Sequence, residues 1–149
     1  MKRLFWLHDE SLCVPRQANS DDLLVFCWHP AYFEQQGWSL KRLVFIYESL
    51  CSLPVSIYAG EPSELLQALK QQHPLSEILI QQPLDPLLTA QLENLSQAHA
   101  VTFYPAPSML DDSHIKPSKR FYTYWQQVAQ QLGQTSPQKT QFHRYHRNK

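Results

Sequence analysis

Five short runs of mostly apolar residues recur along the first 104 positions of the chain. They are "RLFWL" (3–7), "LLVFCW" (23–28), "VSIYA" (55–59), "EILIQ" (77–81) and "AVTFY" (100–104). Near-continuous apolar runs of this length are typical of strands that are buried on both faces, and such strands occur in parallel sheets.

The segments between these runs show helical spacing instead. Residues 39–53 place apolar side chains three and four apart behind an N-cap at Ser39: Leu40, Leu43, Val44, Tyr47, Leu50 and Cys51. Helices are also expected at 62–73, beginning with Pro62, and at 85–99, where Asp85 is the cap and Pro86 the first helical residue. A last helix is expected from about residue 121 to residue 132, where four apolar side chains share one face that should pack on the sheet: Phe121, Tyr124, Trp125 and Val128. The alternative is that the interleaved aromatic and basic residues of "KRFYTYW" (119–125) stack on bases and meet phosphates.

This alternation predicts a Rossmann-like three-layer α/β/α fold with a five-stranded parallel sheet of order 3-2-1-4-5. Residues 8–22 have no strong helical period, so any helix between the first two strands should be short. We assign residues 1–132 to one domain. Residues 133–149 are polar and basic and are expected to form a flexible tail.

The charge is unevenly distributed along the chain. Residues 1–112 contain 13 acidic and 6 basic side chains, whereas residues 113–149 contain 7 basic and no acidic ones, giving −7 and +7. Such a segment indicates either a nucleic-acid-binding arm or a tail that folds back on an acidic body. The candidate nucleic-acid-binding residues of the tail are Lys139, Arg144, Arg147 and Lys149.

The composition bears on where the protein is found and on the role of its cysteines. No apolar run is long enough for a membrane span or a signal peptide, so we expect a cytoplasmic protein without a membrane partner. The three cysteines are widely spaced and lack a C-x-x-C pattern. They are interpreted as small apolar residues, and no metal site is predicted.

Ligands of open α/β sheets bind at the carboxyl ends of the strands, where the strand order reverses. The predicted order delivers a small set of polar residues to that crevice: His8, Asp9, Glu10, His29, Pro30, Gln81 and Gln82. Adjacent side chains such as His8 and Asp9 rarely face one another, and no nucleophile accompanies them. Polar loop residues are therefore favoured over catalysis, and a small enzyme using His8 and Asp9 is the alternative.

The three glycines, Gly37, Gly60 and Gly133, form neither a dinucleotide-binding fingerprint nor a P-loop. Gly60 in "SIYAGEPSELLQAL" (56–69) is read as a turn that leads into a helix. The alternative is that the free N–H groups of that helix meet an anion.

Several stretches together resemble the N-terminal α/β domain of the photolyase and cryptochrome family. They are "VFCWHP" (25–30), "RLVFIYESLCSL" (42–53), "GEPSELLQAL" (60–69) and "FYTYW" (121–125). The resemblance covers roughly residues 3–130. It implies the Rossmann-like fold and a domain that precedes a helical, FAD-binding catalytic domain in that family.

The resemblance also sets expectations about cofactors and partners. Because FAD belongs to the helical domain, we expect neither FAD nor photorepair from this chain. The family's α/β domain helps to hold an antenna chromophore, a folate or a deazaflavin, but His29 replaces the family's Asp before Pro30 and "QQPLDPLLTAQL" (81–92) replaces its acidic and arginine positions. No cofactor is therefore expected, and an antenna is the alternative.

The leading interpretation is a non-catalytic binding or interaction module with a small-ligand crevice. The partner would be a second copy of the chain or a separate FAD-bearing subunit, and nucleic acid is the rival partner.

Overall fold

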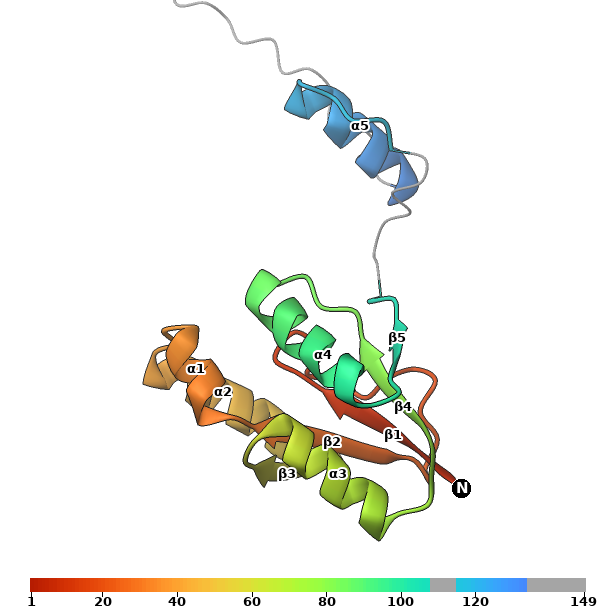
Figure 1. The fold of residues 1–149 in the computed structure, drawn as a ribbon. Coiled ribbons are helices and arrows are strands. Elements are labelled where there is room, and N and C mark those ends of the chain that lie inside the picture. Colours follow the sequence, from red (N-terminus) through yellow and green to blue (C-terminus); the bar gives the residue numbers. More distant parts are fainter. Residues whose placement is uncertain (108–114, 134–149) are drawn as a thin grey trace, which may run out of the picture. The chain divides into compact units, whose positions relative to one another are not determined.

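The computed structural model describes residues 1–107 and 115–133, and its regular elements follow the expected order. Five parallel strands form one sheet of order β3-β2-β1-β4-β5 (Figure 1). The strands are Lys2–Leu7 (β1), Leu23–Trp28 (β2), Ser56–Ala59 (β3), Leu75–Gln81 (β4) and Thr102–Tyr104 (β5). The predicted Rossmann-like fold and strand order are confirmed.

Strand β1 lies in the middle of the sheet and supplies its most deeply buried side chains. Leu4 and Phe5 are both fully buried, and Leu4 lies opposite Leu23 of β2 and Ile78 of β4. A central strand has neighbours on both edges and layers on both faces, which explains the continuous apolar run in this part of the sequence.

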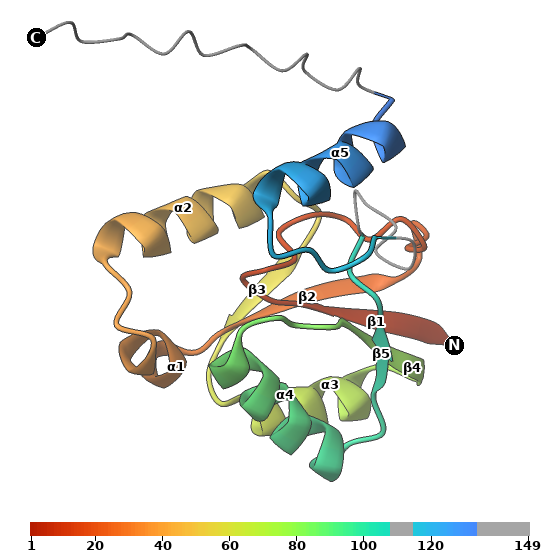
Figure 2. The same ribbon diagram turned by 90° about the horizontal axis from the view of Figure 1, so that it is seen from above.

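Helices cover both faces of the sheet. Helix α2 (Leu40–Cys51) lies on one face, and helices α3 (Pro62–Gln72) and α4 (Pro86–Ala98) lie on the other (Figure 2). Helix α1 (Pro30–Gln35) follows directly after β2. The sequence did not predict α1, because six residues are too few to reveal a helical period.

Helices α3 and α4 begin in the same way, with an acidic N-cap followed by a proline. The carboxylates of Glu61 and Asp85 each accept hydrogen bonds from the first N–H groups of their own helix. Pro62 and Pro86 have no N–H to leave unpaired, and their fixed φ suits the first helical turn. This local chemistry explains why both helices start at the predicted residues.

The buried face of α2 differs from the expected one. Ile46 and Leu50 are each 1% exposed, whereas Leu40 is 75% exposed. The other side chains of the predicted face that are exposed are Val44, Tyr47 and Cys51. The helix carries two overlapping apolar stripes, and only the one containing Ile46 and Leu50 packs on the sheet, so the prediction was wrong for these side chains.

Residues 8–22 connect β1 to β2 without a helix, as their polar sequence indicated. The connection is anchored near its end by Arg3, whose Nε and Nη2 lie 3.2 and 2.6 Å from the two carboxylate oxygens of Asp22. Nη2 also donates to the carbonyl oxygen of Gln17 at 2.9 Å. The bidentate pair thus holds an irregular segment against the amino end of the central strand.

The chain divides into two compact units, Met1–Ala106 and Pro107–Lys149. Helix α5 (Phe121–Gln131) belongs to the second unit, whereas the sequence placed it in a domain that ended at residue 132. Residues 105–120 contain three prolines and no periodic apolar pattern, as is common in the segment between two compact units. The assignment of residues 1–132 to one domain stays a prediction. The predicted tail from residue 134 onward lies outside the described residues.

The cysteines are unpaired, and Cys13 and Cys51 are exposed rather than buried as small apolar residues would be. Only Cys27 is partly buried, next to the site described below. No helix in the described ranges has the length and apolar character needed to cross a membrane.

Candidate functional site

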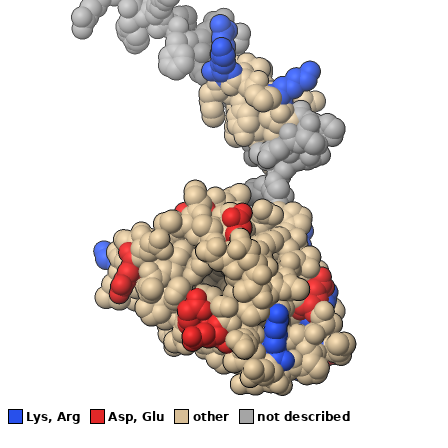
Figure 3. Space-filling view, viewed as in Figure 1, with Lys and Arg blue, Asp and Glu red and all other residues tan. Residues whose placement is uncertain are grey.

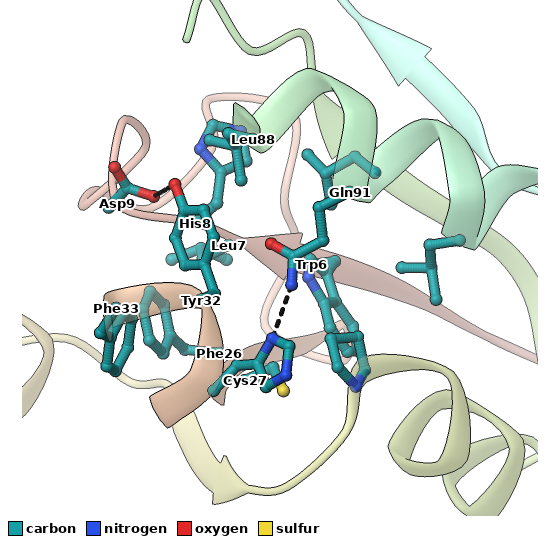
Figure 4. A pocket seen from close by; sticks show the side chains of 14 residues that line it. Trp6, Leu7, His8, Asp9, Phe26, Cys27, Tyr32, Phe33, Leu88 and Gln91 are labelled. Atoms are coloured by element: carbon teal, nitrogen blue, oxygen red, sulfur yellow. Dashed lines mark hydrogen bonds between the residues drawn. The ribbon is translucent and has the colours of Figure 1, made fainter. Parts of the chain in front are cut away.

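A small cavity lies between α1 and α4, at the carboxyl ends of β1 and β2 (Figure 4). Its volume of about 30 Å³ is enough for one or two water molecules. Most of its wall is apolar or aromatic. The lining residues are Trp6, Leu7, His8, Asp9, Phe26, Cys27, His29, Tyr32, Phe33, Pro62, Leu88, Gln91, Leu92 and Leu95.

A wider groove of about 330 Å³ adjoins this cavity. The two spaces share five lining residues: His29, Tyr32, Pro62, Gln91 and Leu95. Figure 3 shows the molecule hollowed near the centre of this face, with acidic side chains beside the hollow where α3 begins. The groove reaches the size of sites that take small molecules, and the cavity forms its apolar recess.

His29 and Gln91 meet at the junction of groove and cavity. The amide Nε2 of Gln91 lies 2.6 Å from Nδ1 of His29 (Figure 4). The amide nitrogen only donates, so Nδ1 accepts and the neutral ring carries its proton on Nε2. The pair joins α4 to the start of α1 and places two polar groups at the mouth of an apolar recess.

His8 follows β1 and is only 4% exposed. Its Nε2 lies 2.9 Å from the carbonyl oxygen of Gln81, and its Nδ1 accepts a hydrogen bond from the N–H of Glu10 at 3.2 Å. Burial lowers the pKa of His8, and the bond to Gln81 and the nearby carboxylates oppose this shift. Both ring nitrogens are occupied, so His8 has no free lone pair with which to take a proton from a substrate.

Asp9 is tied to a chain of polar side chains that spans three elements. The hydroxyl of Tyr32 donates to Asp9 at 3.2 Å, and Gln36 donates both to that hydroxyl at 3.0 Å and to Asp85 at 2.8 Å. Burial raises the pKa of Asp9, and the bond from Tyr32 opposes the rise. Asp9 and His8 therefore bond to different groups and do not form an acid/base pair.

Glu10 fastens the loop after β1 to the loop after β4. Its carboxylate accepts hydrogen bonds from the N–H groups of Leu84 at 2.6 Å and Asp85 at 2.9 Å. Together with the bond between His8 and Gln81, these contacts span the point where the strand order reverses. The chain's own groups thus occupy the predicted crevice between β1 and β4, and the open space lies on the β2 side.

The remaining predicted crevice residues also fall away from this space. Gln81 is buried and contributes its carbonyl to His8, while the N–H of Gln82 donates to the carbonyl oxygen of Tyr104 at 2.8 Å. Pro30 lines a separate hollow beside Trp38. None of the three is among the described residues that line the cavity or the groove.

The turn after β3 does not offer an anion site. Gly60 has a φ of 151°, which favours glycine, and the carboxylate of Glu61 accepts from the N–H groups of Ser63 at 2.7 Å and Glu64 at 3.3 Å. Glu61 therefore occupies the place that an anion would take. It also lines the groove, and no lysine or arginine does so among the residues the structure describes.

One serine and histidine pair at the edge of the groove, which Ser63 lines, resembles a nucleophile with its base. Ser63 Oγ lies 3.0 Å from Nε2 of His99, and Nζ of Lys70 lies 3.2 Å from Nδ1 of the same ring. An ammonium group only donates, so Nδ1 accepts and Nε2 carries the proton. His99 therefore cannot activate Ser63. Residues 1–107 and 115–133 also contain no group of three His, Cys, Asp or Glu residues placed to hold a metal ion.

Sequence reasoning missed Tyr32, Cys27 and Gln91. A signal for Gln91 exists, because it lies three residues after Leu88 and four before Leu95, on the buried stripe of α4. Cys27 donates to the carbonyl oxygen of Gly60 at 3.4 Å, and burial raises its pKa to about 12. No comparable signal marks Tyr32, because α1 is too short to show one.

The basic candidates of the C-terminal segment fall outside the described residues. They are Lys139, Arg144, Arg147 and Lys149. Three other cations of the same segment are described, and all three are exposed: Lys116, Lys119 and Arg120.

Comparison with models of protein families finds no match for this chain, and comparison with curated proteins finds no significant match either. The resemblance to photolyases therefore rests on the sequence motifs alone.

Proposed function

We propose that this chain is a photolyase-related α/β domain that works as a non-catalytic binding module, with the groove and its recess as the site for a small ligand. The carrying observation is the pair of His29 and Gln91 at the mouth of an apolar cavity. A mostly apolar pocket with a few convergent polar groups is the usual form of a small-molecule site. Its place at the carboxyl ends of parallel strands agrees with the rule for open α/β sheets.

Charge defines the class of ligand. Asp9 lines the recess and Glu61 lines the groove, and neither lining contains a lysine or an arginine. Arg42 lies 3.9 Å from Asp9 but lines neither space, so it is not placed to bind a ligand there. Burying an anion beside these carboxylates without a cation of its own is unfavourable. The ligand is therefore a neutral or cationic molecule with a compact apolar group that enters the recess.

Gln91 is the residue expected to orient the ligand. Its amide already bonds to His29 across the mouth of the recess at 2.6 Å, and both side chains face the shared space. A ligand that carries its own amide or hydroxyl group would replace one partner of this bond and keep both side chains paired. Leaving either group unpaired would reduce affinity, so the pair favours ligands that carry a hydrogen-bonding group.

The polar groups that could perform chemistry support binding over catalysis. His8 has both ring nitrogens bonded, and Asp9 is held by Tyr32. The Ser63 and His99 pair has its proton on the wrong nitrogen for activation. The catalytic alternative, a small enzyme using His8 and Asp9, therefore lacks a histidine with a free ring nitrogen and a carboxylate free of other partners.

Ligand-observed NMR with three matched probes tests the proposal. We expect nicotinamide (neutral) and benzylamine (cationic) to bind the full chain and benzoate (anionic) to bind far more weakly. The substitution Gln91→Leu should weaken nicotinamide binding about three- to tenfold, the loss expected for one hydrogen bond.

Gln97→Leu is the matched control, because Gln97 is an exposed residue of the same helix. It should bind like the wild type. Benzoate binding as tightly as benzylamine, or a Gln91→Leu variant with unchanged affinity for nicotinamide, would show that the groove is not this site.

The same charge argument bears on chromophores. FAD carries phosphates and folates carry carboxylates, and the linings of the groove and recess supply no lysine or arginine for them. We expect the chain purified from its own cells to lack near-UV and blue absorption bands. A retained flavin, folate or deazaflavin spectrum would contradict the proposal.

A further inference from the structure

Helix α5 and the residues before it present aromatic and cationic side chains to solvent. Phe121 is 75% exposed, Tyr122 is 40% exposed and Tyr124 is 37% exposed, so the expectation that Phe121 and Tyr124 pack in a core was wrong, whereas Val128 is buried as expected. The cations beside them, Lys116, Lys119 and Arg120, are exposed as well. We refer to these six residues as the α5 surface.

The charge of this surface has no internal compensation. Residues 115–133 contain three basic and no acidic side chains, a net charge of +3. The two ion pairs found among the described residues join Arg3 to Asp22 and Arg42 to Asp9, so neither involves the α5 surface. An exposed cationic group of this kind is complementary to a polyanion.

Local hydrogen bonds hold the surface in shape. Gln127 bonds to the backbone of Lys116 twice, accepting from its N–H at 2.8 Å and donating to its carbonyl oxygen at 3.2 Å. The hydroxyl of Ser118 accepts from the N–H of Arg120 at 3.2 Å. The segment that carries the cations is thereby folded back along the helix that carries the aromatic rings.

The aromatic rings indicate which kind of polyanion this surface would bind. The rings of Phe121 and Trp125 are nearly parallel, with 16° between their planes and 6.3 Å between their centroids. Aromatic faces interleaved with cations are typical of proteins that bind single strands, where bases stack on the rings and phosphates meet the cations. A membrane-binding helix would present a broad apolar face of Trp, Phe and Leu side chains opposite a charged face, without polar residues among them. The exposed residues of α5 include Thr123, Gln126 and Gln130.

We propose that the α5 surface binds single-stranded nucleic acid without strong sequence preference. Phe121, Tyr122 and Tyr124 supply stacking faces, and Lys119 and Arg120 contact phosphates. This function is independent of the small-ligand groove, and its residues are separate from those that line the groove.

Fluorescence anisotropy with the full chain and a labelled oligothymidylate of about 16 nucleotides tests the proposal. The double variant Lys119→Gln/Arg120→Gln should lower the slope of log Kd against log salt by about 1.4, since each phosphate contact on a single strand contributes about 0.7. The double variant Phe121→Leu/Tyr122→Leu should weaken binding about fivefold or more at fixed salt and leave the slope unchanged.

Lys41→Gln is the matched charge control, because Lys41 is an exposed cation of α2. Its affinity and salt slope should equal those of the wild type, and circular dichroism should confirm that every variant is folded.

Four outcomes would overturn the proposal. The first is wild-type affinity in both double variants. The second is loss of binding only on Arg144→Gln/Arg147→Gln, which would place the surface in the tail. The third is equal or tighter binding of duplex DNA. The fourth is binding to phosphatidylserine vesicles, but not to the oligonucleotide, that survives Phe121→Leu/Tyr122→Leu.

Discussion

The ring of His8 lies 2.9 Å from the carbonyl oxygen of Gln81, although the two residues are 73 positions apart in the chain. This bond crosses from the end of β1 to the end of β4, where an open α/β sheet usually receives its ligand. Glu10 adds two more bonds to the loop after β4. His8 and Glu10, two candidate site residues from the sequence, thus have structural roles. The open cavity lies instead at the carboxyl ends of β1 and β2.

Replacing His8 tests this structural role. We expect His8→Phe to lower the free energy of unfolding by about 2 kcal/mol or more, because a buried carbonyl and the N–H of Glu10 lose their partner together. Urea denaturation followed by circular dichroism measures the loss. The control is His73→Phe, at a half-buried histidine whose ring makes no hydrogen bond with the described residues. It should change stability by about 0.5 kcal/mol or less; equal losses in the two variants would contradict the role of His8.

The lowered pKa of His8 predicts a pH dependence of stability. The unfolded chain takes up a proton at His8 near its ordinary value of 6.5, whereas burial keeps the folded ring neutral to lower pH. Falling pH therefore favours the unfolded state, so this contribution is complete above about pH 6.5 and is lost below it.

Urea midpoints at about pH 7.5 and about pH 5 check the prediction, and His8→Phe should show a smaller difference between them than the wild type. The raised pKa of Asp9 acts in the opposite direction, since its contribution is present at low pH and is lost as pH rises through the folded pKa. A His8→Phe variant with the full wild-type pH dependence would assign the effect to other groups.

Asp85 offers a second stability test, because it caps α4 and also receives the amide of Gln36. We expect Asp85→Ala to lower the free energy of unfolding by about 1 kcal/mol, the usual loss for an N-cap. Asp85→Asn keeps an oxygen for the cap and should remain close to the wild type in thermal denaturation. If the asparagine variant is as unstable as the alanine variant, the charge rather than the cap is responsible.

Thiol labelling tests the environment of the pocket. Cys27 has a pKa raised to about 12 by burial, so at about pH 8 only roughly one molecule in ten thousand carries its thiolate. Cys13 and Cys51 are exposed. Mass spectrometry after brief treatment with iodoacetamide should therefore show two modified cysteines in the folded chain and three in urea. Rapid labelling of Cys27 in the folded chain would show that the recess opens to solvent.

The architecture could be predicted because its signals are local. Buried parallel strands leave continuous apolar runs, and the pairs Glu61–Pro62 and Asp85–Pro86 mark helix starts through chemistry within one turn. The buried face of α2 was predicted only in part. Two apolar stripes overlap on that helix, and long-range packing decides that Ile46 rather than Leu40 faces the sheet.

The site was harder to predict, because it too depends on contacts between residues far apart in the sequence. Topology correctly indicated which strand ends lie near one another, and it brought His8, Asp9 and His29 to one cavity. It could not indicate that His8 and Glu10 bond to the opposite loop and fill the crevice. Gln91 stands on a helix rather than at a strand end, so a search confined to strand ends missed it.

The bonds between the loops after β1 and β4 also constrain how the protein is made. Strand β1 is the first to be synthesised but is the central strand of the finished sheet. The partners of Glu10 lie 74 and 75 residues further along the chain. During translation β1 can pair with β2 early, but its other edge stays open until β4 has left the ribosome. Until then His8 also has no bond to the carbonyl oxygen of Gln81. The nascent chain therefore carries a central strand with one unpaired edge until β4 has been synthesised, and a chaperone that shields this edge would act before residue 85 emerges.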